Sequence, residues 1–361
     1  MTVAKIPLKK RIALKLFKHY KNNQSKLHQL NYIFWECTLR CNLNCLHCGS
    51  DCKKDAGVKD MPIADFLKAI DQIIPIVEPN KTMIVLTGGE VLLRNDIEEL
   101  GKELYKRGFP WGIVTNGMLL SKARLNSLLD SGLRAVTISL DGLEDSHNWL
   151  RNNKNSFNRA VEAIKLLPQT QGLKYDVVSC VNRKNIDELP QLKAMLIDIG
   201  IKNWRLFPIT PIGRAATNDL MKLSANKYKQ LLDFIKQTRK ENKINAEHAC
   251  EGFLGNYEKE VRNDFFFCRA GINIGSVLAD GSISACPNLR SNFNQGNIYK
   301  DNFADVWQNK YQVFRDRTWT KKGICATCKS YEYCEGNGMH LWDGQNGELS
   351  FCNLKQLELA E

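Results

Sequence analysis

Short runs of β-branched and aromatic residues alternate with longer segments of helical periodicity between Leu30 and about residue 240. The short runs predict strands, and the longer segments predict amphipathic helices that pack on them. Six repeats of this kind are typical of parallel strand–helix units. Strands are expected at residues 32–36, 83–87, 112–115, 135–140, 175–181 and 204–208, and helices at 63–77, 96–107, 122–131, 157–167, 186–199 and 225–240.

The pattern changes on both sides of this repeat. Residues 1–29 contain eight lysines and arginines and no acid, and Ile12, Leu14, Leu16 and Phe17 are interleaved with them. This arrangement predicts a basic amphipathic helix that either solubilises the chain or contacts an anionic membrane surface or an acidic partner. After residue 245 the rhythm stops and a cysteine-rich segment begins. We therefore expect a leader at 1–29, a barrel at 30–245 and a small domain at 246–361.

Composition narrows the class of protein. The chain has 361 residues, of which 43% are hydrophobic, so it can bury a large core. Its 13 cysteines are an odd number, which argues against a disulfide framework and favours metal ligation in a reducing compartment. The sequence has no apolar stretch of membrane-spanning length and no secretory signal, so a cytoplasmic protein is expected. The net charge of +12 comes without a nucleic-acid-binding module, and we expect no nucleic-acid partner.

Polar and glycine-rich residues follow successive predicted strands, at the ends where a parallel barrel carries its functional loops. Because these strand ends meet at one mouth of the barrel, we expect a shared pocket there. Its candidate residues are Cys41, Cys45 and Cys48 after the first strand, Gly88, Gly89 and Glu90 after the second, Asn116 after the third and Ser139 in the fourth.

Cys41, Cys45 and Cys48 form a C-x3-C-x2-C triplet that offers three thiolates to one metal centre. An iron–sulfur cube has four irons and is normally held by four thiolates. A cube on three thiolates therefore leaves one iron open to a small molecule. Zinc is the alternative, although it prefers four closed ligands and C-x2-C pairs.

The triplet, within WECTLRCNLNCLHCGSDC, resembles the signature of the radical S-adenosylmethionine (radical SAM) enzymes. The resemblance implies a [4Fe-4S] cluster on the three cysteines, whose open iron binds the amino and carboxylate groups of S-adenosylmethionine. It also implies one-electron reduction by a donor such as flavodoxin or ferredoxin. Reductive cleavage then gives methionine and a 5′-deoxyadenosyl radical, which abstracts hydrogen from the substrate.

Two strand-end motifs are similar to the family's cosubstrate site. Gly88 and Gly89 let the backbone approach a ligand closely, and Glu90 offers a carboxylate to the amino group of S-adenosylmethionine. Asn116 is expected to hydrogen-bond a ribose hydroxyl. The alternatives are ordinary turns at Gly-Gly and at Asn-Gly.

Three further residues have cosubstrate roles implied by the resemblance. A Ser and an Arg twelve positions apart bind the carboxylate or ribose in related maturases, and Ser139 and Arg151 have this spacing. Arg also offers a planar fork that suits a carboxylate. His47 stands where relatives usually place an aromatic side chain near the adenine. A helix-surface Arg151 and an exposed loop position for His47 are the alternatives.

A second cysteine set lies near the C-terminus. Cys325-x2-Cys328-x5-Cys334 and the later Cys352 give four thiolates, which suit one closed iron–sulfur cube or a zinc ion. Upstream, Cys268 and Cys286 bracket a predicted hairpin with its turn at Asp280-Gly281. The pattern resembles the SPASM auxiliary-cluster domain of peptide- and protein-modifying radical SAM enzymes, similar to anaerobic sulfatase maturases and lipoprotein-associated members. The predicted fold is therefore a partial (β/α)6 TIM-like barrel followed by a SPASM/twitch-like domain.

The SPASM resemblance has gaps. Gly338 stands in place of one usual cysteine, and another cysteine shortly after Cys268 is missing. A second auxiliary cluster on Cys268 and Cys286 would thus lack two ligands, unless Cys250 or a non-cysteine group completes it. Pro287 replaces an Asp that acts as a base in sulfatase-maturing relatives, which argues against formylglycine formation by that route. Three other cysteines are interpreted as small buried thiols, although the first two flank the triplet: Cys37, Cys52 and Cys180.

The resemblance implies an enzyme that modifies a peptide or protein, with the precursor of a secreted or lipid-anchored protein as the candidate substrate. One alternative is radical SAM oxidation or rearrangement of a small molecule. Another is a non-catalytic zinc or iron–sulfur scaffold protein. Fold and cofactor alone do not decide among them.

Overall fold

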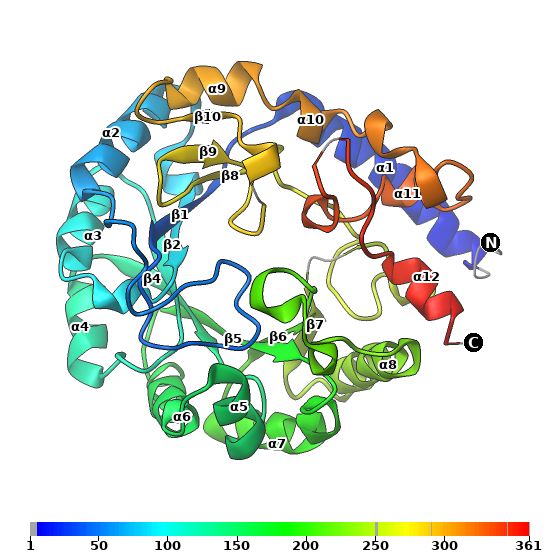
Figure 1. Cartoon of the computed structure of the whole chain (residues 1–361), viewed down its shortest axis with the longest axis horizontal. Coiled ribbons are helices and arrows are strands. Elements are labelled where there is room, and N and C mark those ends of the chain that lie inside the picture. The colour runs from blue at the N-terminus through cyan, green and yellow to red at the C-terminus, as the bar shows by residue number, and fades with distance from the viewer. Residues whose placement is uncertain (1–5, 250–251, 290, 345, 361) are drawn as a thin grey trace.

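The computed structural model describes residues 6–249, 252–289, 291–344 and 346–360. Its centre is a ten-stranded sheet curved into an open barrel, with helices on the outer side (Figure 1). Six parallel strands lie in chain order within this sheet: β1 (Tyr32–Thr38), β2 (Met83–Gly88), β3 (Trp111–Thr115), β4 (Leu133–Ser139), β5 (Lys174–Val181) and β6 (Asn203–Pro208). The predicted α/β class with a partial barrel is confirmed.

The connecting helices surround the barrel (Figure 1), and each overlaps a predicted one: α2 (Ile63–Ile73), α3 (Ile97–Lys106), α4 (Lys122–Asp130), α6 (Ser156–Leu166), α7 (Leu189–Ile199) and α8 (Ala225–Glu241). The first ends before residue 77 because Pro75 has no amide hydrogen, and a 3₁₀ turn (Ile74–Ile76) follows. One helix that the sequence pattern did not predict, α5 (Glu144–Arg151), lies in the loop after β4.

A seventh parallel strand, β7 (Asn245–His248), follows α8 and pairs with β6. The strand–helix rhythm predicted from the sequence ends at this position and so does not include β7. Ala246 and His248 are buried in alternation with two half-buried polar residues, a pattern too short and too polar to mark a strand by periodicity.

The cysteine-rich segment extends the barrel sheet at its other edge. β8 (Ile274–Val277) pairs in parallel with β1, and β9 (Ser282–Ser284) pairs with β8 in an antiparallel hairpin. The predicted turn is confirmed, with Gly281 at a φ of +83° that favours glycine. β10 (Gly296–Asn297) completes the edge, and four helices follow: α9 (Phe303–Asn309), α10 (Gln312–Arg315), α11 (Tyr331–Cys334) and α12 (Asn353–Glu358). The domain boundaries at residues 29 and 245 stay predictions.

The basic N-terminal segment forms α1 (Leu8–Leu27), which lies beside α11 (Figure 1). Its inner face packs on the cysteine-rich region, where Phe17 contacts Phe265 with ring centroids 5.4 Å apart. Lys21 on this face is only 3% exposed. The helix is thus attached to the region that carries the downstream cysteines.

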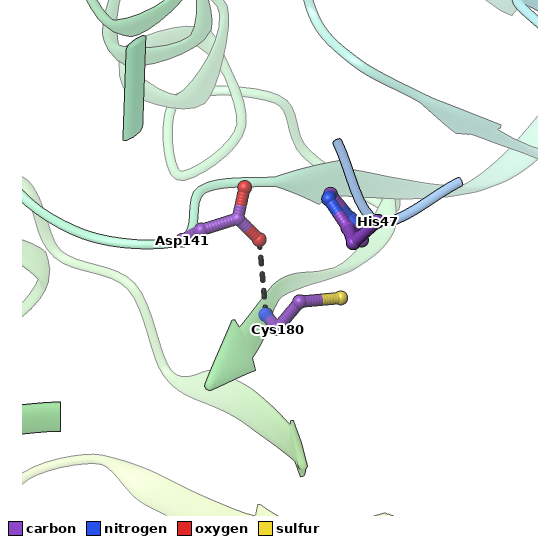
Figure 2. A group of neighbouring side chains, drawn as sticks. All are labelled: His47, Asp141 and Cys180. Atoms are coloured by element: carbon purple, nitrogen blue, oxygen red, sulfur yellow. Dashed lines mark hydrogen bonds between the residues drawn. The ribbon is translucent and has the colours of Figure 1, made fainter. Parts of the chain in front are cut away.

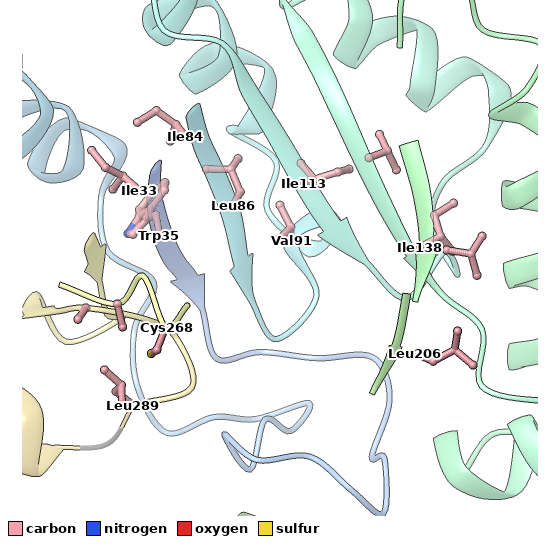
Figure 3. Close-up of a cluster of buried hydrophobic side chains, with 14 of the residues drawn as sticks. Ile33, Trp35, Ile84, Leu86, Val91, Ile113, Ile138, Leu206, Cys268 and Leu289 are labelled. Carbon is pink, nitrogen blue, oxygen red and sulfur yellow. The ribbon is translucent and has the colours of Figure 1, made fainter. Parts of the chain in front are cut away.

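One hydrophobic cluster joins the barrel to the cysteine-rich segment. Trp35 of β1 stacks on Phe66 of α2 with ring centroids 4.2 Å apart. Figure 3 shows Trp35 in the same cluster as Cys268 and Leu289. Within the described parts of the chain, no helix has the length and apolar character needed to cross a membrane.

Candidate functional site

The triplet lies on a loop after β1, residues 39–53, here called the cluster loop. The loop folds back on itself through a bond of 2.7 Å from the amide of Cys41 to the carbonyl of Lys53. Cys41 and Cys45 are each 8% exposed, and Cys48 is half-buried. Together with Leu43 and Cys52 they form a small cluster of their own at the mouth of the barrel.

The three triplet thiols are not gathered as closely as around a single ion. Among the described residues, the only three His, Cys, Asp or Glu ligand atoms within 4.8 Å of one another belong to His47, Asp141 and Cys180. A tetrahedral zinc ion holds its sulfurs about 3.8 Å apart, given a Zn–S bond of about 2.3 Å. In an iron–sulfur cube each thiolate binds a different iron, so the sulfurs stand further apart.

Burial also affects the triplet thiols. Burial, and to a smaller extent the neighbouring Cys45, Glu90 and Cys48, raises the pKa of Cys41 to about 11. A coordinated metal deprotonates such thiols directly, so the metal centre rather than the protein environment would keep the sulfur ionised. This chemistry suits a metal ligand and does not suit a free nucleophile.

The three residues in Figure 2 do not form an open cation site, because the Asp141 carboxylate already has partners. Its Oδ1 accepts a bond of 2.9 Å from the amide of Cys180, which Figure 2 marks. The carboxylate also accepts two bonds from the guanidinium of Arg151, from Nε to Oδ2 at 2.6 Å and from Nη2 to Oδ1 at 3.1 Å. A cation here would stand against a positive charge.

Arg151, which the sequence assigns to the cosubstrate, lies at the cluster loop. It is 8% exposed, and its Nη1 is 3.9 Å from the sulfur of Cys45. Burial opposes ionisation of Asp141, but Arg151 and His147 outweigh it and hold the pKa of this carboxyl well below its usual range. A fixed negative charge thus orients the guanidinium toward the cysteine. Arg151 ends α5 but is buried, so it is not the helix-surface residue of the alternative interpretation, and its role toward the cosubstrate stays a prediction.

His47 lies on the cluster loop near this ion pair. Burial and the charge of Arg151 lower the pKa of His47 to about 4, so the imidazole is neutral. Its Nδ1 is buried and has no hydrogen-bond partner among the described residues. The side chain is therefore a neutral ring with a free polar atom at the barrel mouth.

The glycine pair lies directly under the cluster loop. A Cβ on Gly89 would come within 2.0 Å of the carbonyl oxygen of Arg40, and one on Gly88 within 2.2 Å of that of Thr38. The amide of Gly89 donates to the Thr38 carbonyl at 2.7 Å, and the amide of Glu90 donates to the Arg40 carbonyl at 2.9 Å. The two glycines therefore allow the backbone after β2 to bond the start of the loop.

Glu90 is fully buried and links the ends of β2 and β3. Its carboxylate accepts bonds from the amide of Leu92 at 3.1 Å, from Oγ1 of Thr115 at 2.7 Å and from the amide of Asn116 at 2.8 Å. Burial raises its pKa. The structure thus gives Glu90 three protein partners that the sequence did not indicate, and its role toward an amino group stays a prediction.

Asn116 and Ser139 occupy the neighbouring strand ends. Nδ2 of Asn116 donates to Oδ1 of Asn42 at 2.8 Å and lies 4.0 Å from the sulfur of Cys41. Ser139 is half-buried at the end of β4 and stands opposite Val178 of β5. Asn116 therefore contacts the cluster loop, whereas Ser139 lies on the adjoining wall of the barrel.

Two residues at this site were not identified from the sequence. Asp141 lies in the sequence Ser-Leu-Asp-Gly at residues 139–142, and only its position after β4 signals a role. Arg214 follows β6, and its Nε donates to the carbonyl of Cys45 at 2.7 Å. Its Nη1 donates to Asp51 at 2.7 Å and to the carbonyl of Cys52 at 3.1 Å. Arg214, in the loop after β6, thus holds the cluster loop in place through three hydrogen bonds.

The unassigned cysteines differ in their surroundings. Cys37 is fully buried in the main core, and burial raises its pKa strongly. Cys52 is buried beside the triplet, and its amide lies 3.4 Å from the sulfur of Cys48. A hydrogen bond from the Cys52 thiol lowers the pKa of Cys48. Cys52 therefore contacts a triplet sulfur, whereas Cys37 does not belong to the site.

Of the downstream cysteines, Cys325 and Cys328 lie just before α11, Cys334 ends α11 and Cys352 directly precedes α12. Burial and the neighbouring Cys352 and Cys328 thiols raise the pKa of Cys325 to about 11. Burial, Cys352 and Cys325 raise that of Cys334 to about 12. The four sulfurs are thus close enough to affect one another, yet no three of them lie within the spacing of a single ion.

The second auxiliary site is less complete. Cys268 is 8% exposed within the main hydrophobic core (Figure 3), and Cys286 is half-buried just after β9. Gly338, which replaces a usual ligand, precedes a 3₁₀ turn (Met339–Leu341). Cys250 lies outside the described residues. A cluster on Cys268 and Cys286 stays a prediction.

Comparison with known proteins agrees with this geometry. Residues 35–196 match the radical SAM superfamily, and residues 268–329 match SPASM, an iron–sulfur cluster-binding domain. An AdoMet-dependent heme synthase of Methanosarcina barkeri is 25% identical over 326 residues, which cover 84% of this chain and 90% of the relative. The mycofactocin maturase MftC of Mycolicibacterium smegmatis is 28% identical over 309 residues, which cover 84% and 77%.

Solved structures share the fold over most of the chain. SuiB of Streptococcus suis, bound to the precursor peptide SuiA, has a TM-score of 0.69 at 18% identity, covering 92% of this chain and 78% of SuiB. SuiB bound to S-adenosylmethionine gives the same TM-score. The chain is therefore an enzyme of the radical SAM superfamily that carries a C-terminal SPASM domain.

Proposed function

We propose that Cys41, Cys45 and Cys48 hold a [4Fe-4S] cluster with one open iron and that S-adenosylmethionine binds there. The observation that carries this proposal is the convergence of three thiols on one buried loop, with Asn116 and Arg151 lying 4.0 Å and 3.9 Å from two of the sulfurs. When bound, the cluster and S-adenosylmethionine supply the reductive cleavage that gives a 5′-deoxyadenosyl radical.

The protein's own residues position and enclose this chemistry. Asp141 holds Arg151 so that one edge of the guanidinium faces Cys45, where a fork of donors can receive a carboxylate. His47 offers a neutral ring to the adenine, and Asn116 offers an amide beside Cys41. Glu90 accepts a bond from the backbone amide of Asn116 and so fixes the position of that residue. Its carboxylate is also proposed to bind the amino group of S-adenosylmethionine. Ser139 on the adjoining strand is proposed to bind the carboxylate or ribose.

We propose that Cys325, Cys328, Cys334 and Cys352 hold one auxiliary [4Fe-4S] cluster. The proximity of these thiols, which raise one another's pKa, supports it. The second auxiliary site, at Cys268 and Cys286, is proposed to bind a cluster only if Cys250 or a non-cysteine group completes its ligands.

The proposed substrate is a peptide or protein, with the precursor of a secreted or lipid-anchored protein as the candidate. The shared fold with SuiB, which was solved with a precursor peptide, supports this choice. The heme synthase relative supports a second candidate, a small-molecule substrate. Incubation of the reconstituted enzyme with precursor peptides and, separately, with a low-molecular-weight cell extract distinguishes the two by which sample changes in mass.

Cysteine variants test the cluster assignment. After anaerobic reconstitution, Cys45→Ala should lose reductant-dependent release of 5′-deoxyadenosine and keep the iron and sulfide of the downstream cluster. Cys37→Ala is the matched control, because Cys37 is a core thiol outside the site, and it should keep the release. Release by Cys45→Ala equal to that of the parent would refute the assignment, and zinc without sulfide in the parent would favour a scaffold protein.

We also propose that the outer face of α1 contacts an anionic membrane surface. Leu8, Ile12 and Leu16 follow one another at helical spacing and are 68%, 53% and 67% exposed. Lys9 and Lys15 are exposed beside them, so a lipid surface with negative charge complements this face. The full chain should sediment with phosphatidylglycerol vesicles but not with phosphatidylcholine vesicles, and Leu16→Glu should abolish this binding. Equal sedimentation with both vesicles, or with neither, contradicts the proposal.

A further inference from the structure

A cavity of about 960 Å³ lies between α1 and the cysteine-rich region. Two of the four ligands proposed for the auxiliary cluster, Cys328 and Cys334, form part of its wall, as does Cys268 of the second auxiliary site. Both are half-buried, whereas Cys325 is 7% exposed. One side of the auxiliary site therefore faces the cavity.

Basic side chains dominate the wall of this cavity. Seven lysines and arginines line it, against three acids. Lys21 has a carboxylate partner, since its Nζ lies 2.8 Å from Oε2 of Glu335. The other six form no ion pair with a carboxylate within the part of the chain that the structure describes: Lys18, Lys26, Arg315, Arg317, Lys321 and Lys329.

Two of these six cations, Arg315 and Arg317, are held in place by backbone carbonyls without being neutralised. Nη2 of Arg317 donates to the carbonyl of Asn337 at 2.8 Å, and Nε of Arg315 donates to that of Gly271 at 3.2 Å. Lys18 and Lys26 come from α1, while the rest come from the cysteine-rich region (Figure 1). Two segments almost 300 positions apart therefore combine into one positive surface around Cys328 and Cys334.

We propose that this basic cavity docks an acidic one-electron carrier protein and that electrons enter the enzyme through the cluster on Cys325, Cys328, Cys334 and Cys352. This inference rests on the proposed function. Cys325, Cys328, Cys334 and Cys352 would hold the cluster that accepts one electron as the reduced carrier loses it, and this electron, passed to the cluster that Cys41, Cys45 and Cys48 would hold, is the one consumed when the sulfonium C–S bond breaks. No further oxidant or reductant is needed.

Charge and access both favour this surface. An uncompensated positive surface attracts an acidic partner over long range and raises the rate of encounter. At the barrel mouth, by contrast, Cys41 and Cys45 are buried within the cluster loop, which Arg214 holds through the carbonyl of Cys45. That mouth must also admit the substrate, so a carrier protein that docks elsewhere does not compete with it.

Charge reversal tests the docking site without touching the proposed cluster ligands. Lys321 and Lys329 are exposed, so the double variant Lys321→Glu, Lys329→Glu should fold normally. With reduced flavodoxin as donor, we expect about a tenfold rise in the donor concentration that gives half-maximal release of 5′-deoxyadenosine. Release driven by dithionite, a small chemical reductant, should be unchanged. The control variant Lys122→Glu, Lys165→Glu reverses two exposed lysines on α4 and α6 and should behave as the parent.

The two proposals fail in different ways. Absence of dithionite-driven release in the parent overturns the proposed function, whereas equal flavodoxin dependence of the two double variants overturns only the docking site. A measurement on the unmodified holoenzyme gives an independent test. Added flavodoxin should protect backbone amides of residues 18–26 and 321–332 from hydrogen exchange, and protection of residues 39–53 instead would also overturn the inference.

Discussion

Arg151 bonds Asp141 through two nitrogens and places a third 3.9 Å from the sulfur of Cys45. Both partners of this ion pair are buried, so the pair is insulated from water and from salt. The carboxylate therefore fixes the guanidinium in one orientation. Removing either partner leaves an uncompensated charge next to the cluster loop.

Asp141→Asn should destabilise the fold and reduce turnover together. An unpaired buried guanidinium costs roughly 3–5 kcal/mol, which urea denaturation of the variant and the parent would measure. Glu162→Gln is the control, because the exposed Arg159–Glu162 pair contributes at most about 1 kcal/mol. A loss of stability in Asp141→Asn no larger than that of the control would show that the ion pair does not hold this part of the fold.

The same pair predicts a pH dependence. Because the pKa of Asp141 is held below its usual range in the folded protein, its contribution to stability is present above about pH 4, the value for an unfolded Asp. It is lost as the pH falls through the folded pKa. The difference in unfolding free energy between the parent and Asp141→Asn should thus be constant from about pH 5 to 7 and shrink below about pH 4. A difference that grows on acidification would contradict this sign.

Gly89→Ala should break the hydrogen bonds between the backbone after β2 and the start of the cluster loop. The new Cβ would meet the Arg40 carbonyl at 2.0 Å, and backbone cannot yield as a flexible side chain does. We expect a loss of roughly 1–3 kcal/mol and less iron at the first cluster after reconstitution. Gly172→Ala is the control: nothing lies within 4 Å of its Cβ, although its positive φ costs about 1 kcal/mol. Equal iron content in the two variants would contradict the steric argument.

The strands and helices of the barrel follow from the sequence because each has its own strong periodicity. Where that local signal is weak the prediction fails, as for the four residues of β7 and for the short α5. The proposed ligands are also local, since their spacing along a loop identifies them. Loop residues that act through distant partners carry no such signal.

Glu90 and Arg214 illustrate this limit. The sequence assigns Glu90 to the cosubstrate by its motif, but it cannot show that Thr115 and Asn116, from the next strand, bond the same carboxylate. Arg214 lies 163 positions from Asp51, and only the closing of the barrel brings the two together. Partners of this kind depend on tertiary structure rather than on any pattern within one segment.

Lys21→Met should weaken the auxiliary site. Lys21 contacts this site in the fold although it lies 312 positions before Tyr333 in the sequence. Nζ of Lys21 donates to the carbonyl of Tyr333 at 2.9 Å and to Glu335 at 2.8 Å, so it holds the residues on both sides of Cys334. Methionine keeps the apolar stem but removes both bonds. We expect the unfolding free energy to fall by roughly 2–4 kcal/mol.

Because α1 would no longer hold the turn around Cys334, the auxiliary cluster of Lys21→Met should also lose iron to a chelator faster than the parent. Lys15→Met is the matched control, since Lys15 is exposed on the same helix and should change stability by less than about 0.5 kcal/mol. Iron release and denaturation are measured on the same reconstituted samples. If Lys21→Met is destabilised yet releases iron at the parent's rate, α1 supports the fold but not the cluster. If Lys21→Met and Lys15→Met have the same unfolding free energy and the same rate of iron release, Lys21 supports neither the fold nor the cluster.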